Sequence, residues 1–250
     1  MPGPPENALY WGGQSEEYLS TFQRNQGQSN HCGAYAVGAA LSLLRGGRTL
    51  DYRELAGSAD RSTSLLWAAL LGVPGLLFGP TRRLWPGGPI TPRQQANLAR
   101  WAARRRGFKV KAKVMRGTVD DLWRYLAQPG TVVLVTIGWD DDTRPRIAHP
   151  DDGKLKPFPP VGAIRILDRT VRYPFAAHVM ALAAYDPSRT ATAEGEEIAT
   201  PWGFINSWRD GHEREKPGYG RLYWMPDADF RAAWEYSILI GSRYMVVIAA

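Results

Sequence analysis

A run of β-branched and apolar residues, TVVLVTI at 131–137, constrains the fold of this chain more than any other stretch. β-branched side chains pack well on a pleated strand, and a run of this length without a charge favours a strand in the interior of a sheet. Most of the chain after this run also shows strand patterns. These strands are predicted at 163–167, 178–185, 202–207, 219–224 and 237–249.

The chain before residue 131 shows mainly helical patterns. Helices are predicted at 32–44, 51–59, 64–71, 91–106 and 119–127. Thr91 and Thr118 stand at N-cap positions, and Pro92 suits the first position of its helix. The helix at 32–44 is rich in glycine and alanine, so neighbouring elements can approach it closely. Alternation of apolar residues with lysine predicts one half-exposed strand at 108–114.

The order of these patterns predicts an α+β protein, with helices in the first half and strands in the second. Residues 1–24 are rich in proline, glycine and polar residues and are expected to form an N-terminal arm. Residues 25–250 are expected to form the folded domain, with a helical part at about 25–128 and a β part at about 129–250. Two long connections are expected between the elements, a loop at 139–160 and a polar segment at 186–200.

The cysteine and histidine content narrows the chemistry. The chain has one cysteine, which excludes an internal disulfide, and four scattered histidines. It contains no HExxH segment and no CxxC pair, so neither a metal site nor a cofactor is expected. The N-terminus lacks a basic segment followed by an apolar one, and no apolar run has the length of a membrane span. We therefore expect a cytoplasmic protein with no membrane partner, although export by a dedicated machine is compatible with the same sequence.

Charge is distributed unevenly along the chain. The formal net charge is +7, and no acidic residue lies between Asp60 and Asp120. Two interpretations stay open: a solvated basic face at 82–116, or a platform for an acidic partner, either an acidic protein or a nucleic acid. No recognised nucleic-acid motif accompanies this stretch, so nucleic acid is not the expected partner. Its basic residues are Arg82, Arg83, Arg93, Arg100, Arg104, Arg105, Arg106, Lys109, Lys111, Lys113 and Arg116.

Cys32, the single cysteine, opens the predicted helix at 32–44 and follows a polar loop. A thiol is a useful nucleophile only as thiolate, which a helix N-terminus and a nearby imidazolium both stabilise. Gln26 precedes Cys32 by six residues, so its amide can donate to an oxyanion, with the Cys32 backbone N–H as second donor. The alternatives are a small buried cysteine and an ordinary loop glutamine. His31 adjoins Cys32 but is sterically awkward as its base.

Two later segments can complete such a site. His178 opens the apolar strand at 178–185, and Asn206 stands near the end of the strand at 202–207. An amide oxygen at Asn206 can accept from one ring nitrogen of His178 and leave the other to face a sulfur atom. Trp208 lies on the same side of an extended chain as Asn206 and can shield that bond from water. The alternative for His178 is a core or edge histidine without a catalytic role.

Other polar residues have simpler interpretations. His149 and His212 lie in polar loops and are expected to be exposed. The aspartates at 140–142 and 151–152 lack the spacing of an EF-hand loop, so solvated turns are expected there rather than a cation site.

Three segments together resemble the papain-like cysteine peptidases: NQGQSNHCGAYAVGAAL at 25–41, HVMALAAYD at 178–186 and INSWRDGHEREKPGYGRLYW at 205–224. The resemblance rests on a glutamine, cysteine, histidine and asparagine in this chain order and on an Asn-Ser-Trp motif. It implies a papain-like two-lobed fold, with a helical N-terminal lobe and an antiparallel β C-terminal lobe. It also implies catalytic roles for Gln26, Cys32, His178 and Asn206. Gly33 and Trp208 are the predicted substrate-binding residues.

The chain departs from that family at two positions. Gly33 follows the cysteine, where papain and its close relatives have tryptophan. The Cys-Gly-Ala order is similar to the C39-type branch, which trims leader peptides and uses an aspartate as third catalytic residue. Asp186 ends the histidine strand, but it lies eight residues after His178, so Asn206 is preferred. Arg209 stands where the family usually has glycine.

The sequence therefore predicts a cysteine peptidase, a thiol-dependent hydrolase that cleaves peptide bonds of a protein or peptide substrate. Two alternatives remain open. The same residues can deamidate or transamidate a glutamine on a target protein, as papain-like toxins and effectors do. Alternatively, the domain is a catalytically retired binding module that uses the basic face at 82–116.

Overall fold

The run predicted as a buried strand forms β3 (Thr131–Trp139), which lies inside a nine-stranded antiparallel sheet. The structure is a computed structural model, and it describes residues 4–26, 30–46, 50–60, 69, 90–166, 169–207, 221–236 and 242–250. Eight strands follow one another across the sheet in the order β2 (Lys111–Arg116), β13 (Tyr244–Ala249), β3, β8 (Ala176–Tyr185), β11 (Trp202–Ile205), β12 (Tyr223–Met225), β4 (Arg146–Ala148) and β5 (Leu155–Pro157). The ninth strand, β1 (Leu9–Tyr10), pairs with β8.

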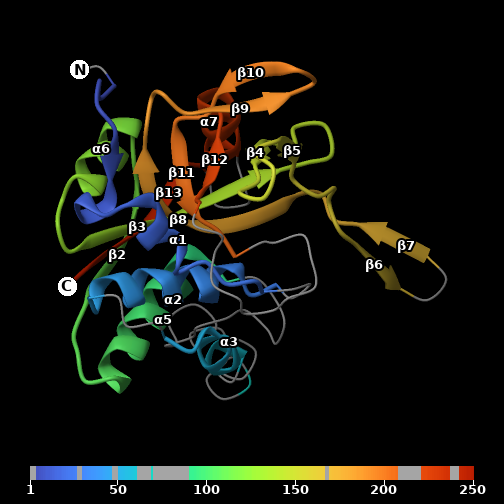
Figure 1. The fold of residues 1–250 in the computed structure, drawn as a ribbon. Coiled ribbons are helices and arrows are strands. Elements are labelled where there is room, and N and C mark those ends of the chain that lie inside the picture. The colour runs from blue at the N-terminus through green and yellow to red at the C-terminus, as the bar shows by residue number, and fades with distance from the viewer. Residues whose placement is uncertain are drawn as a thin grey trace.

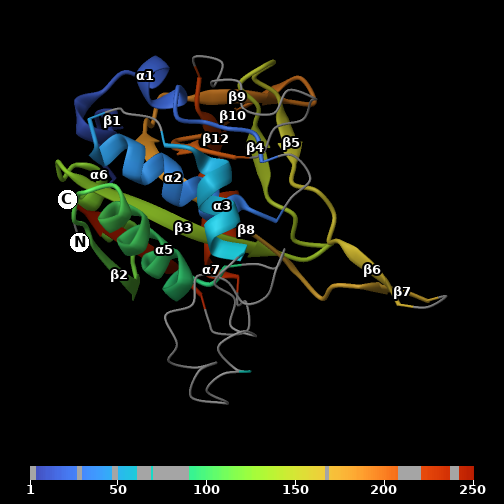
Figure 2. The same cartoon turned by 90° about the horizontal axis from the view of Figure 1, so that it is seen from below.

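Helices cover both faces of this sheet, which explains why β3 is buried along nearly its whole length. The described helices are α1 (Glu16–Ser20), α2 (Cys32–Leu44), α3 (Tyr52–Asp60), α5 (Pro92–Arg105), α6 (Val119–Leu126) and α7 (Asp227–Glu235), with a 3-10 turn η1 (Trp11–Gly13). Helices α2 and α5 lie on one face, with α3 packed against them, and α6 and α7 lie on the other (Figures 1 and 2). The protein is therefore α+β, as predicted.

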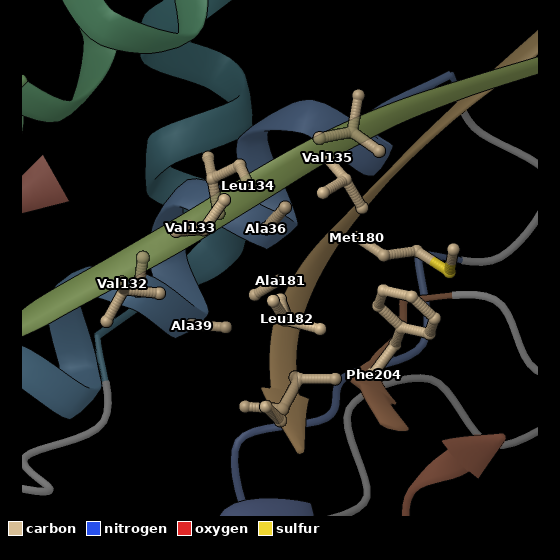
Figure 3. Packing of buried hydrophobic residues seen from close by; sticks show 14 of the residues in the cluster. Ala36, Ala39, Val132, Val133, Leu134, Val135, Met180, Ala181, Leu182 and Phe204 are labelled. Carbon is tan, nitrogen blue, oxygen red and sulfur yellow. The ribbon is translucent and has the colours of Figure 1, made fainter. Parts of the chain in front are cut away.

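Small residues let α2 lie close to its neighbours. Ala36 and Ala39 face the side chains of β3 and β8 (Figure 3). On another side of the helix, a Cβ at Gly38 would come within 2.6 Å of the Tyr52 ring of α3. The close approach that the glycine and alanine content predicts is confirmed.

The predicted helix boundaries agree well with the structure where capping residues mark them. Helix α2 begins and ends at the expected residues. Thr91 and Thr118 both cap their helices through capping boxes, with Gln94 and Asp121 as the reciprocal partners. Each box satisfies two backbone N–H groups that the helix itself cannot pair. The helix predicted at 64–71 lies outside the described residues, apart from residue 69.

The segment expected as an N-terminal arm packs against the domain. β1 pairs with the end of β8, and the side chains of Trp11, Leu19 and Phe22 are buried. The Trp11 indole donates to the carbonyl oxygen of Thr131 at the start of β3. These residues therefore belong to the hydrophobic core, while the domain boundary at residue 24 stays a prediction.

The structure corrects two expectations about the connections. The loop expected at 139–160 contains β4 and β5, and the polar connection at 186–200 forms a hairpin of β9 (Thr190–Ala193) and β10 (Glu196–Ala199). Both predictions were wrong because each of these strands has only three or four residues, too few to show an alternating pattern. Glu194 and Gly195 in the hairpin turn both have positive φ, as in a type I′ turn, but Glu-Gly is a weaker turn signal than Asn-Gly.

The predicted boundary at about residue 128 does not separate all helices from all strands, because β2 precedes it and α7 follows it. A second hairpin, β6 (Ala163–Ile166) with β7 (Arg169–Arg172), projects from the body of the protein (Figure 1). Of the helices in the described part of the chain, none combines the length and the apolar character that crossing a membrane requires.

Candidate active site

His178 and Asn206 lie side by side in the middle of the sheet. His178 is the third residue of β8, opposite Ile137 of β3, and Asn206 directly follows β11, the next strand. The ring nitrogen Nε2 of His178 lies 2.7 Å from Oδ1 of Asn206. Both side chains are buried, with 6% and 2% of their surface exposed. The structure thus brings together two residues that the sequence separates by 28 positions.

The hydrogen bond determines the proton arrangement of the imidazole ring. Oδ1 of Asn206 is an amide oxygen and can only accept, so Nε2 of His178 carries the proton and donates it. In the neutral ring, the basic lone pair is then on Nδ1. Burial lowers the pKa of His178 to about 4, because an imidazolium loses its hydration there, while the bond to Asn206 favours the charged form. His178 is therefore a neutral base at neutral pH unless an anion lies beside it.

An apolar wall encloses His178. The Phe158 ring lies 5.8 Å from the imidazole, centroid to centroid, and is itself completely buried. Phe158 also packs on Trp139 at the end of β3. Phe158 was not among the predicted site residues, because it lies in the segment expected as a loop and its only local signal is an aromatic residue among prolines. Trp208, which was expected to shield this bond, lies outside the described residues.

Asp186, the alternative third residue, does not lie near His178. It follows the last residue of β8, so about eight strand residues, or roughly 26 Å, separate the two positions. Its carboxylate accepts from the Tyr10 hydroxyl and from the backbone N–H and hydroxyl of Ser188, and it lies 3.6 Å from Nε of Arg189. Asp186 therefore anchors the N-terminal segment, and Asn206 is the residue beside the histidine.

Gln26 is held next to Asn206 by two hydrogen bonds to Ser207. The Gln26 backbone N–H donates to the Ser207 carbonyl oxygen at 2.9 Å, and the Ser207 hydroxyl donates to Gln26 Oε1 at 2.7 Å. Because Oε1 accepts from Ser207, the NH₂ branch of the same amide is turned the other way. Ser207 was not among the predicted site residues, although it belongs to the Asn-Ser-Trp motif that pointed to this region.

Cys32 is the first residue of α2, the helix that packs on β8 and β3. The His31 side chain makes no capping hydrogen bond to the helix. The Cys32 N–H is in the first helical turn, where N–H groups have no acceptor within the helix and the dipole favours negative charge. Cys32 is partly exposed and packs against the hydrophobic core.

The face of α2 that carries Cys32 points toward Asn206. Residues three, four and seven positions after Cys32 share its helix face, namely Tyr35, Ala36 and Ala39. These three residues line a narrow recess together with Asn206 and Ser207. Cys32 belongs to the same helix face, one turn before Tyr35 and Ala36.

Gly33 has a packing reason to be glycine. It is buried, and a Cβ at this position would lie 2.4 Å from Cγ1 and 2.6 Å from Cδ1 of Ile90. The Gln95 side chain of α5 is 3.6 Å from the same point. The tryptophan that papain relatives carry after the cysteine has no room here. The predicted substrate contact of Gly33 stays a prediction.

The remaining histidines do not join this site. His149 was expected to be exposed, but that prediction was wrong: only 7% of it is exposed, and its ring meets the Tyr223 ring edge to face at 5.4 Å. β4 and β12 pair just beside it, which buries a segment that looked like loop. His212 lies outside the described residues. Within the ranges that the structure describes, no three side chains of His, Cys, Asp or Glu are placed to hold a metal ion.

The chain was compared with family models, curated proteins and solved structures. No family model matches this chain, and no curated protein matches it. The chain is similar to the crystal structure of a candidate C39-like peptidase from Bacillus anthracis, at 15% identity and a TM-score of 0.48. The match covers 97% of this chain and 98% of the other. At this identity, a similar backbone course says nothing about which residues act in either protein.

Proposed function

We propose that this protein is a cysteine peptidase that hydrolyses peptide bonds through Cys32, His178 and Asn206, with Gln26 in the oxyanion hole. The observation that carries the proposal is the buried 2.7 Å bond between His178 Nε2 and Asn206 Oδ1. This bond leaves the base Nδ1 on a ring whose position is fixed, on the strand against which the Cys32 helix packs.

In the proposed reaction, Nδ1 of His178 first takes the thiol proton of Cys32, and Sγ of the thiolate then attacks the carbonyl carbon of the substrate. The C=O electron pair moves to oxygen and gives a tetrahedral oxyanion. When this intermediate collapses, the C–N bond breaks and Nδ1 returns the proton to the leaving amine. The substrate acyl group remains on Cys32 as a thioester.

Water completes the cycle. Nδ1 takes one proton from the attacking water, and a second tetrahedral oxyanion forms. The C–S bond then breaks, the acid product leaves, and Cys32 regains its proton from His178. Asn206 keeps the ring in one orientation through both steps. Burial alone keeps the ring neutral, and a thiolate on Cys32 would raise the pKa of His178 by favouring the imidazolium.

Two donors are proposed to stabilise the oxyanion. One is the backbone N–H of Cys32, at the positive end of the α2 dipole. The other is the Gln26 amide NH₂, whose orientation Ser207 fixes by donating to Oε1. Removing one donor of this kind typically reduces the rate about 10²- to 10³-fold.

The first test is alkylation of Cys32 by iodoacetamide from about pH 4 to about pH 9, followed by intact mass. We expect rapid labelling well below the ordinary thiol pKa of about 8.5, because a thiolate can pair with the His178 imidazolium. His178→Ala is expected to return the pH profile to that of an ordinary thiol. His31→Ala is the matched control, since it removes the histidine adjacent to Cys32 in the chain and should leave the profile unchanged.

Labelling that follows an ordinary thiol in the wild type, or that ignores His178, would contradict the proposal and favour a retired binding module. Product masses from a candidate protein target then identify the reaction. A cut chain supports the peptidase. An intact chain heavier by about one mass unit is the result expected of a deamidase, because an amide has become an acid.

A further inference from the structure

The strand β2 forms one end of the large sheet. It pairs with β13 on one side, and no described segment pairs with it on the other. The Gly117 N–H donates to the Arg243 carbonyl oxygen, one residue beyond this ladder. In an antiparallel pair, the backbone groups of successive residues point alternately toward the partner strand and away from it. Gly117 bonds toward the chain of β13, so every second residue before it, starting with Arg116, faces the other way. The backbone groups of Ala112, Val114 and Arg116 therefore point outward, away from β13.

The outward position of Ala112 is confirmed by a side chain. Nη1 of Arg100 donates to the Ala112 carbonyl oxygen at 2.5 Å, and Nη2 bonds Asn97 Oδ1 at 2.7 Å. Arg100 belongs to α5, which lies over β2 and β13 on one face of the sheet (Figure 2). Its side chain therefore reaches from that face to the outward edge of β2. Further along the strand, Val114 is 36% exposed, and no described side chain bonds its outward N–H or C=O.

Arginines of α5 line this edge. Residues 93, 97, 100 and 104 follow the helical spacing of three and four, so Arg93 and Arg104 share a face with Arg100. α5 and β2 run in opposite directions. Arg93 lies about 10 Å along the helix from Arg100, and Arg116 lies about 13 Å along the strand from Ala112. Arg93 is therefore level with the Arg116 end of β2. Arg93 and Arg104 are exposed, and no acidic side chain of the described chain forms an ion pair with either.

We propose that this edge, the outward side of β2 together with Arg93, Arg100 and Arg104, binds an acidic extended segment of a partner protein as an added strand. The segment would donate to and accept from the backbone of Val114 and place carboxylates against the arginines. Charge complementarity selects the occupant, because the edge also carries the exposed side chains of Lys111 and Lys113.

The same charges exclude a second copy of this chain. Two β2 edges would bring Lys111, Lys113 and the arginines of both copies together, and lysines on an edge strand oppose such pairing. A negatively charged strand is attracted to this edge, because its carboxylates would lie beside arginine and lysine side chains. The binding surface is separate from Cys32 and His178, so it does not depend on the proposed reaction.

The test measures fluorescence anisotropy of a labelled peptide with alternating glutamate and valine, titrated with the full chain carrying Cys32→Ala to prevent cleavage. We expect binding that weakens with salt. Arg93→Glu with Arg104→Glu should weaken it at least about tenfold, and Arg53→Glu, an exposed arginine on α3, should change it less than about twofold.

Val114→Pro tests strand addition itself. Proline here removes one outward N–H and leaves every bond to β13 intact, so the domain should stay folded, as circular dichroism would verify. We expect about fivefold weaker peptide binding. The proposal is overturned by absence of binding at about 1 mM protein, by equal binding of a lysine–valine peptide, by indifference to Val114→Pro, or by tighter binding of single-stranded DNA.

Discussion

Ser207 makes two hydrogen bonds to Gln26, one through its carbonyl oxygen and one through its hydroxyl. Only the second depends on the side chain. Ser207→Ala should therefore loosen the Gln26 amide without displacing its backbone. We expect kcat/KM to fall about fivefold, the effect of one neutral hydrogen bond, on any peptide the enzyme is found to cleave.

A double-mutant cycle with Gln26→Ala tests this interpretation. If Ser207 acts by orienting Gln26, Ser207→Ala should have no further effect once the glutamine is gone. Equal effects of Ser207→Ala in both backgrounds would show that Ser207 acts independently of Gln26.

Gly33 is the second residue whose identity the packing explains. Gly33→Ala places a methyl group within 2.6 Å of two carbon atoms of Ile90, and Ile90 itself is buried. Overpacking of this kind costs about 1–3 kcal/mol of unfolding free energy, measured by urea denaturation. Ile90→Ala should restore part of the loss in the double variant, because it removes the atoms that clash. No recovery would mean that the backbone at position 33, rather than Ile90, is what excludes a side chain.

At the scale of elements, α1 is joined to the sheet by one carboxylate. Oε1 of Glu16 accepts from the Leu222 N–H and from the Trp224 indole, each at 2.9 Å, and Oε2 pairs with Arg189. Only 14% of the Glu16 side chain is exposed. A nearly buried charge therefore ties the N-terminal segment to the residues just before β12 and just before β9.

Glu16→Ala is expected to lower the unfolding free energy by about 2 kcal/mol, because two N–H groups lose their acceptor and Arg189 loses its partner. The estimate is discounted for Arg189, which is 38% exposed. Urea denaturation measures it, with the exposed neighbour Glu17→Ala as control, for which we expect a change within about 0.5 kcal/mol. Similar losses in both variants would point to α1 itself rather than to the anchor.

Elements were predictable in proportion to their local signals. α5 and α6 carry threonine N-caps, and α2 is a run of small and apolar residues that a glycine pair follows in the sequence. The predicted bounds of all three lie within a residue or two of the observed ones. α7 was not predicted, because it begins after a proline without a side-chain cap. β4 is only three residues long, and it is held by pairing with β5 and β12 and by the ion pair of Arg146 with Asp229.

For the whole molecule, the burial of His178 makes stability depend on pH. Its pKa is about 4 in the folded protein and about 6.5 in the unfolded chain. Between these values the unfolded chain binds a proton that the folded protein does not, so acid favours unfolding. Above about pH 6.5 both states are neutral at this residue, and the free energy of unfolding no longer depends on it.

We therefore expect the unfolding free energy to fall by about 3 kcal/mol as the pH is lowered from about 6.5 to about 4. Urea denaturation of the Cys32→Ala protein measures this decrease, because no thiolate can then stabilise the imidazolium. His178→Gln should remove most of the slope, and His31→Gln should keep it. A slope that survives His178→Gln would assign the acid sensitivity to other groups.

The sequence by itself determined the α+β class, the strand β3, the capped helices and the residue types of the candidate site. These features depend on local periodicity, backbone capping and side-chain chemistry, which short segments already contain. Only the tertiary structure decided that Asn206, not Asp186, lies beside His178, that Phe158 encloses the ring, and that Ser207 orients Gln26. These relations depend on strand order and register, because pairing of β8 with β11 and β3 brings together residues that are distant in the chain.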